Sequence, residues 1–94
     1  SSATYGTVVS YTVPADSTFE LWAIEVACDD YDALQLKLTI AGVVQFTDKQ
    51  VQTPFNPQFG GANLVAGAVV LLEAKSDGST SIVVDGAIEG RVVS

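Results

Sequence analysis

Histidine is absent from this sequence, and its absence excludes several kinds of active site. A Ser-His-Asp triad, a Cys-His pair and a zinc site with histidine ligands all require the imidazole ring. The single cysteine, Cys28, leaves no partner for a disulfide within the chain. We expect Cys28 to be a small apolar residue at a strand end, with an intermolecular bridge or a reactive thiol as the alternatives. The sequence therefore predicts a protein that is not an enzyme and needs no cofactor.

Basic residues are scarce, with 4 Lys and Arg against 11 Asp and Glu, for a formal net charge of −7. Such a chain is repelled by phosphate groups, so we expect neither nucleic acid nor a membrane surface as a partner. The longest apolar run, around residues 66–72, is far shorter than the about 20 residues of a membrane-spanning helix. No charged segment followed by an apolar stretch opens the chain, so we also expect no signal peptide.

The length of 94 residues predicts one domain covering residues 1–94, with residues 1–4 as a flexible N-terminal arm. Hydrophobic residues make up 48% of the chain and charged residues only 16%. This composition excludes a disordered tail and leaves little polar cover for the surface. We interpret it as a sign that part of the apolar surface is buried by a partner.

Apolar and polar residues alternate with a period of two along most of the chain, which is typical of β-strands. The clearest alternation covers residues 34–40, and another covers residues 5–13. No helix is expected, and seven or eight short strands separated by turn residues indicate an all-β, antiparallel sandwich. A long irregular connection at residues 53–63, with two prolines and two glycines, favours a jelly-roll-like topology over a simple meander.

Residues 19–27 have apolar side chains on both faces of the expected strand. Phe19 and Leu21 lie on one face, and Trp22 and Ile24 on the other. We expect a central strand that is covered on both sides, one of them by a neighbouring subunit. Two tight hairpins are also predicted, one at residues 41–42 (Ala-Gly) and one at residues 76–79 (Ser-Asp-Gly-Ser).

Acidic side chains crowd one predicted turn, where Asp29, Asp30 and Asp32 follow the second strand. Carboxylate oxygens are the ligands that Ca²⁺ prefers, so these three residues are candidate ligands for a calcium ion. Their spacing lacks the central glycine and terminal glutamate of an EF-hand loop. A solvated acidic turn is the alternative interpretation.

Aromatic residues supply the candidate binding surfaces. Trp22 and Tyr31 are candidates for a sugar-stacking platform, although a core or interface role is expected for Trp22 from its place within a strand. Phe55 and Phe59 either close the end of the sandwich or present an apolar contact to a partner. Residues 91–93 either close the sheet or exchange onto a neighbour. The candidate interface residues are Ser1, Ser2, Ala3, Thr4, Trp22, Phe55, Phe59, Arg91, Val92 and Val93.

Three segments resemble a known group of proteins. These are Val-Pro-Ala-Asp at 13–16 with Thr-Phe-Glu-Leu at 18–21, Leu-Lys-Leu-Thr-Ile-Ala-Gly at 36–42, and Leu-Val-Ala-Gly-Ala-Val-Val at 64–70 followed by Asp-Gly at 77–78. Together they resemble the small β-sandwich capsid decoration, or cement, proteins of tailed bacteriophages. In those families glycine commonly follows the Pro-Ala pair, whereas this chain has Asp16.

The resemblance implies a virion structural protein made in the host cytoplasm. Such a protein forms a homotrimer, binds the major capsid protein lattice on the outer capsid surface and stabilises the shell. The alternative is a carbohydrate- or receptor-binding β-sandwich module of the tail-fibre or adhesin type.

Overall fold

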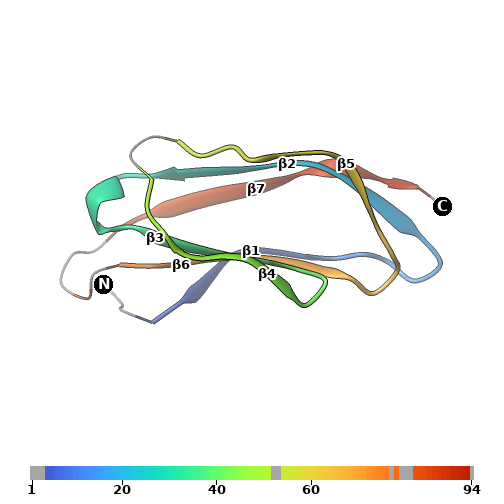
Figure 1. Cartoon of the computed structure of the whole chain (residues 1–94), viewed down its shortest axis with the longest axis horizontal. Helices are drawn as coiled ribbons and strands as arrows, with labels where there is room; N and C mark the ends of the chain where they lie inside the picture. The colour runs from blue at the N-terminus through green and yellow to red at the C-terminus, as the bar shows by residue number, and fades with distance from the viewer. Residues whose placement is uncertain (1–3, 52–53, 77, 79–81, 94) are drawn as a thin grey trace.

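The computed structural model describes residues 4–51, 54–76, 78 and 82–93. They form seven strands in two antiparallel sheets (Figure 1), which confirms the predicted all-β sandwich. A single 3₁₀ turn, η1 (Tyr31–Ala33), is the one helical element among these residues, and none of them belongs to a helix able to span a membrane. The strands are β1 (Gly6–Thr12), β2 (Thr18–Cys28), β3 (Gln35–Ile40), β4 (Val43–Lys49), β5 (Gln58–Leu64), β6 (Val69–Lys75) and β7 (Val84–Val93).

The strand pairing is nested. In the four-stranded sheet the order is β1-β6-β3-β4, and in the three-stranded sheet it is β5-β2-β7. Strand β1 pairs with β6, β2 with β5 and β3 with β4, which is the pairing of one long hairpin folded over on itself, as in a jelly roll. Strand β7 is added at the edge of the second sheet, beside β2. The topology is therefore jelly-roll-like, as the sequence predicted.

The core lies between the two sheets and follows the period-two pattern of the strands. Leu34, Leu36 and Leu38 are fully buried, as their alternation with polar residues predicted. The turn after β3 is also the predicted tight hairpin, because Ala41 and Gly42 both have positive φ and Ile40 pairs with Val43. The buried core cluster consists of Val13, Phe19, Leu21, Ile24, Val26, Leu34, Leu36, Leu38, Ala68, Val70 and Leu72.

Strand β2 is the central strand of its sheet, as expected, but its apolar residues do not lie on two opposite faces. The register of β2 shifts between Leu21 and Ala23 against both of its neighbours, so Trp22 is an extra residue in a β-bulge. The bulge moves the alternation by one position, and Leu21 and Ile24 consequently both face the core. The apolar residues on apparently opposite faces therefore belong to one face, and Trp22 is left on the outside of the sheet.

Strand β5 begins inside the segment that was expected to be irregular. Gly60 and Gly61 both have positive φ and form the matching irregularity opposite Trp22, since Leu21 pairs with Ala62 while Ala23 pairs with Gln58. The two glycines permit a distorted strand where residues with side chains would be strained. Among the described residues, 50–51 and 54–57 belong to the connection between β4 and β5, and Phe55 in it forms a bridge with Val26.

The hairpin predicted at residues 76–79 is not formed. The strands on either side of it, β6 and β7, lie in different sheets, so this connection crosses from one sheet to the other. Asp77 and Ser79 lie outside the described residues. The error arose because the Asp-Gly pair specifies a turn without specifying which strand the chain then joins.

The sandwich is elongated, with extents of 44 × 21 × 18 Å, so its two ends are well separated. One end holds the connections 13–17, 41–42 and 65–68 and the C-terminal end of β7 (right in Figure 1). Six of the eight large exposed hydrophobic side chains among the described residues lie there. We call it the valine end and define it by Val43, Val44, Val65, Val69, Val92 and Val93.

The opposite end carries η1 and the last residues of β4 and β6. Some charged side chains lie on the outer face of the three-stranded sheet. Most of the others lie at this end. We call it the charged end and define it by Asp29, Asp30, Asp32, Asp48, Lys49 and Lys75.

Candidate functional site

Trp22 stands on the outer face of the three-stranded sheet with 48% of its surface exposed. Its ring lies against the backbone of Gly61, where a Cβ atom would come within 3.2 Å of two ring carbons. The indole group also contributes to lowering the pKa of the neighbouring Glu20 carboxyl. The bulge places the ring outside the sheet and its close packing on Gly61 holds it there, so Trp22 forms an aromatic surface open to solvent.

Glu20 and Arg91 form an ion pair beside Trp22. The Arg91 Nε donates to Glu20 Oε1 at 2.7 Å, and a second nitrogen lies 3.4 Å from Oε2. The guanidinium and the indole N–H together lower the pKa of the Glu20 carboxyl, and the carboxylate in turn raises the pKa of Arg91. Arg91 was a predicted interface residue, and it lies on this face.

Glu25 and Glu89 form the other polar group of the face. Glu89 on β7 pairs with Ala23, and Glu25 on β2 pairs with Ala87, so the two acidic residues are close neighbours on the same face. The interaction with the negatively charged Glu25 carboxyl raises the pKa of Glu89.

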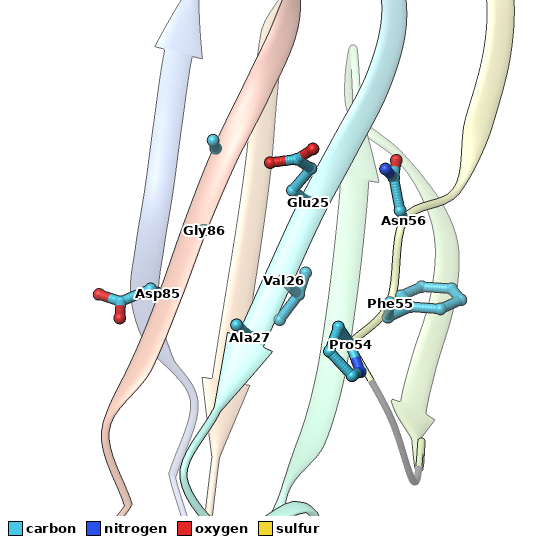
Figure 2. A pocket seen from close by; sticks show the side chains of 9 residues that line it. Glu25, Val26, Ala27, Pro54, Phe55, Asn56, Asp85 and Gly86 are labelled. Carbon is cyan, nitrogen blue, oxygen red and sulfur yellow. The ribbon is translucent and has the colours of Figure 1, made fainter.

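A groove of about 390 Å³ continues from Glu25 along the same face. Its floor is β2 with the small side chain of Ala27, one wall is β7 with Asp85, and the other is the connection that carries Pro54 and Asn56 (Figure 2). Its volume is within the range of about 300–1,000 Å³ seen for small ligand sites. The groove and Trp22 lie on the same outer face of the three-stranded sheet. We call this candidate binding face the Trp22 face and define it by Glu20, Trp22, Glu25, Ala27, Pro54, Asn56, Asp85, Ala87, Glu89 and Arg91.

The outer face of the four-stranded sheet differs, because two lysines lie over the Tyr5 ring. The Tyr5 hydroxyl donates to Asp48 Oδ1 at 2.5 Å and accepts a bond from the Asp48 backbone N–H at 2.8 Å. Lys75 pairs with the same carboxylate at 3.1 Å and lies 4.7 Å from the centre of the Tyr5 ring. Burial and the bond to Asp48 raise the pKa of Tyr5 to about 12.

Asp29 and Asp30, two of the three candidate calcium ligands, accept hydrogen bonds from backbone N–H groups. Asp29 accepts a bond from the Val83 backbone N–H at 2.9 Å, and Asp30 accepts one from the Asp32 backbone N–H at 3.2 Å at the start of η1. Over the described parts of the chain, no three His, Cys, Asp or Glu side chains are arranged to hold a metal ion. Asp29 and Asp30 thus accept hydrogen bonds from the backbone in and beside this turn.

Trp22 and Tyr31, the candidates for a sugar-stacking platform, do not lie together in the structure. Tyr31 lies in η1 at the charged end, where it packs against the core and its hydroxyl accepts a bond from the Cys28 N–H at 3.2 Å. Cys28 ends β2 and packs against the core as expected, and burial raises the pKa of its thiol. Tyr31 in η1 is therefore not a second aromatic residue beside Trp22 on the outer face.

The remaining predicted interface residues are dispersed over the molecule. Phe55 and Phe59 are half-buried and pack against the core, as in the first of the two alternatives for them. Val92 and Val93 belong to the valine end, whereas Thr4 is exposed at the opposite end. Ser1, Ser2 and Ala3 lie outside the described residues. The bulge that exposes Trp22 and the grouping of the valines both escaped sequence reasoning.

Comparison of this chain with protein-family models, with curated proteins and with solved structures finds no match. Its function is therefore inferred from the surfaces described above.

Proposed function

We propose that this protein is a non-enzymatic structural subunit that decorates a viral capsid as a homotrimer and stabilises the shell. The observation that carries the proposal is the grouping of exposed valines at one end of an elongated sandwich. Exposed apolar patches of this kind mark surfaces that bind other proteins. The resemblance of three turn-and-strand segments to phage decoration proteins supports the choice of a capsid as the larger assembly.

The chemistry of the valine end suits burial against copies of itself. Its connections 13–17, 41–42 and 65–68 contain one charged residue, Asp16. A shallow apolar hollow of about 530 Å³ lies there, lined in part by Ala41, Val65 and Val69. Burying apolar surface contributes about 25 cal/mol per Å², and an interface with few charges limits the cost of desolvating them.

The trimer that we propose places three valine ends around a common axis. The strands β4 and β7 lie at open sheet edges and carry Val43, Val44, Val92 and Val93 at this end, so the contact would also cover part of those edges. The charged ends then point away from the axis, and the negative charge keeps an exterior protein apart from packaged nucleic acid. We propose that capsid binding involves the arm at residues 1–4, since Thr4 lies at the charged end.

A matched pair of substitutions tests the role of the valine end. Val65 and Val83 are exposed to a similar extent, 70% and 64%, but Val65 is at the valine end and Val83 at the charged end. Val65→Lys is expected to convert the trimer to a monomer at micromolar concentration, because it would bury a charge between subunits. Val83→Lys should leave the trimer intact. Equal masses for the two variants in light scattering would contradict the proposed interface.

Co-sedimentation tests the capsid assignment separately. The protein is mixed with undecorated capsids built from the major capsid protein of the same genome, and the bound fraction and the capsid disruption temperature are measured. The wild-type chain is expected to bind and to raise that temperature. A chain that lacks residues 1–4 should remain trimeric and bind more weakly. A trimer that fails to bind would refute the capsid role while preserving the valine-end interface.

A further inference from the structure

The chain places its own cations over the Tyr5, Phe46 and Phe55 rings and leaves Trp22 without one. Lys75 lies 4.7 Å from the centre of the Tyr5 ring, Lys49 lies 5.5 Å from that of Phe55, and Lys37 lies 5.8 Å from that of Tyr5. Each distance is within the about 6 Å of a cation–π interaction. All four basic residues belong to the described chain, and none of them lies over the Trp22 ring. Tryptophan is nevertheless the best cation acceptor among the aromatic residues.

The carboxylates around Trp22 are likewise not balanced by the chain itself. Among the described residues the ion pairs are Lys75 with Asp48 and Arg91 with Glu20. Glu25 and Glu89 have only each other as charged partners, and Asp85 on β7 is a third acidic residue along the groove, with its carboxylate directed away from β2. The Trp22 face is thus an indole ring and a groove with an excess of negative charge.

We infer that the Trp22 face binds an arginine or lysine side chain presented by a basic segment of a partner protein. The cationic group lies over the Trp22 ring with its N–H groups toward Glu25 and Glu89. The following residues of the segment occupy the groove between Asp85 and Asn56. The charge complementarity of this face selects the occupant, since an uncharged ligand gains nothing from the unbalanced carboxylates. This inference is independent of the valine end and of trimer formation.

The geometry suits an extended segment. Trp22, Glu25 and Ala27 follow one another along the outside of β2, and the groove continues in the same direction toward the charged end. A chain lying along β2 would therefore present one basic side chain to Trp22 and a later residue to the floor at Ala27 and Ala87. The small size of these two alanine side chains leaves room for the backbone of the bound segment.

The test uses the intrinsic fluorescence of Trp22, the only tryptophan in the chain. The full-length protein is titrated with a short peptide that contains two arginines in a glycine and serine background. The control peptide has citrulline, which is uncharged and nearly the same shape, at both arginine positions. We expect saturable quenching with the arginine peptide, weakening as salt is added, and little quenching with the citrulline peptide.

Two variants separate the ring from the carboxylates, with binding followed by calorimetry. Trp22→Leu is expected to weaken binding of the arginine peptide by about two- to thirtyfold, the contribution of a cation over an aromatic ring. The double variant Glu25→Gln, Glu89→Gln should weaken it by about two- to twentyfold, as the loss of two exposed charge pairs would. The double variant Glu73→Gln, Asp32→Asn removes the same charge from other surfaces and should bind within about twofold of the wild-type chain.

Three results would overturn the inference. The first is equal quenching by the arginine and citrulline peptides. The second is equal weakening by the two double variants, which would mean attraction to net charge alone. The third is saturable quenching by a neutral oligosaccharide that the Glu25 and Glu89 substitutions leave unchanged, which would assign the face to a glycan. Circular dichroism melting curves verify that each variant is folded before binding is measured.

Discussion

The two ends of the sandwich are held together by different kinds of interaction. Toward the valine end the core contacts are apolar, with the Tyr11 and Phe19 rings 4.6 Å apart and Phe19 lying across Gly90, while the Glu20–Arg91 ion pair lies on the outer face beside Val92. At the charged end hydrogen bonds and an ion pair connect the strands, as between Tyr5 and Asp48 and between Lys75 and Asp48. The valine end nevertheless carries six of the eight large exposed hydrophobic side chains among the described residues. This difference is the basis of our proposal that a partner buries the valine end.

The largest effect of a single substitution is expected toward the valine end. A Cβ atom on Gly90 would lie 2.2 Å from the Glu20 carbonyl oxygen and 2.4 Å from a Phe19 ring carbon, so the two strands would have to separate. Gly90→Ala should lower the free energy of unfolding by about 3 kcal/mol. Gly6→Ala at the charged end is the control, since nothing lies within 4 Å of its Cβ position. Similar urea midpoints for the two variants would show that the ends do not differ in packing.

An intermediate effect is expected where Asp29 connects two strands at the charged end. Its carboxylate accepts from the Val83 N–H, and its backbone N–H donates to the Val83 carbonyl at 3.2 Å. Asp29→Ala removes one of these bonds and should cost about 1 kcal/mol, a fall of about 4–8 °C in Tm. Asp29→Asn keeps the acceptor oxygen and should lose less. If the two variants melt together, the hydrogen bond is not what stabilises this end.

The smallest effect is expected from the exposed network of Tyr5, Asp48 and Lys75. The pKa of Tyr5 is raised to about 12 from its ordinary value of 10, so the folded state binds this proton more tightly than the unfolded state does. The stabilisation that comes from this tighter binding of the Tyr5 proton is therefore complete below pH 10 and is lost as the pH rises to about 12. Asp48→Asn should move the Tyr5 titration, followed by absorbance near 295 nm, back toward 10. A titration that the substitution leaves unchanged would mean that burial alone sets this pKa.

Sequence reasoning predicted the parts of this molecule that local rules determine. The alternation at Leu34, Leu36 and Leu38 located a buried strand, and the Ala41-Gly42 pair located a tight turn. It failed where pairing over long distances decides the structure. Nothing near Trp22 in the sequence signals the bulge, because the matching irregularity at Gly60 and Gly61 is almost forty residues away.

The candidate surfaces were harder to predict than the fold for the same reason. Val43, Val65 and Val92 come from separate parts of the chain, and only the nested strand order brings them to one end. The Trp22 face likewise combines β2, β7 and the connection before β5. Val92, Arg91 and Trp22 were named from the sequence as interface candidates, but the residues that accompany them follow only from the sheet topology.

The most direct test of the valine-end interface is the mass of the wild-type chain in solution. Light scattering after size exclusion, at micromolar concentration and at a tenfold lower one, measures it without any partner. We predict a trimer of the 9.8 kDa chain at both concentrations. A monomer at both would contradict the proposal that the exposed valines are buried between copies of this protein.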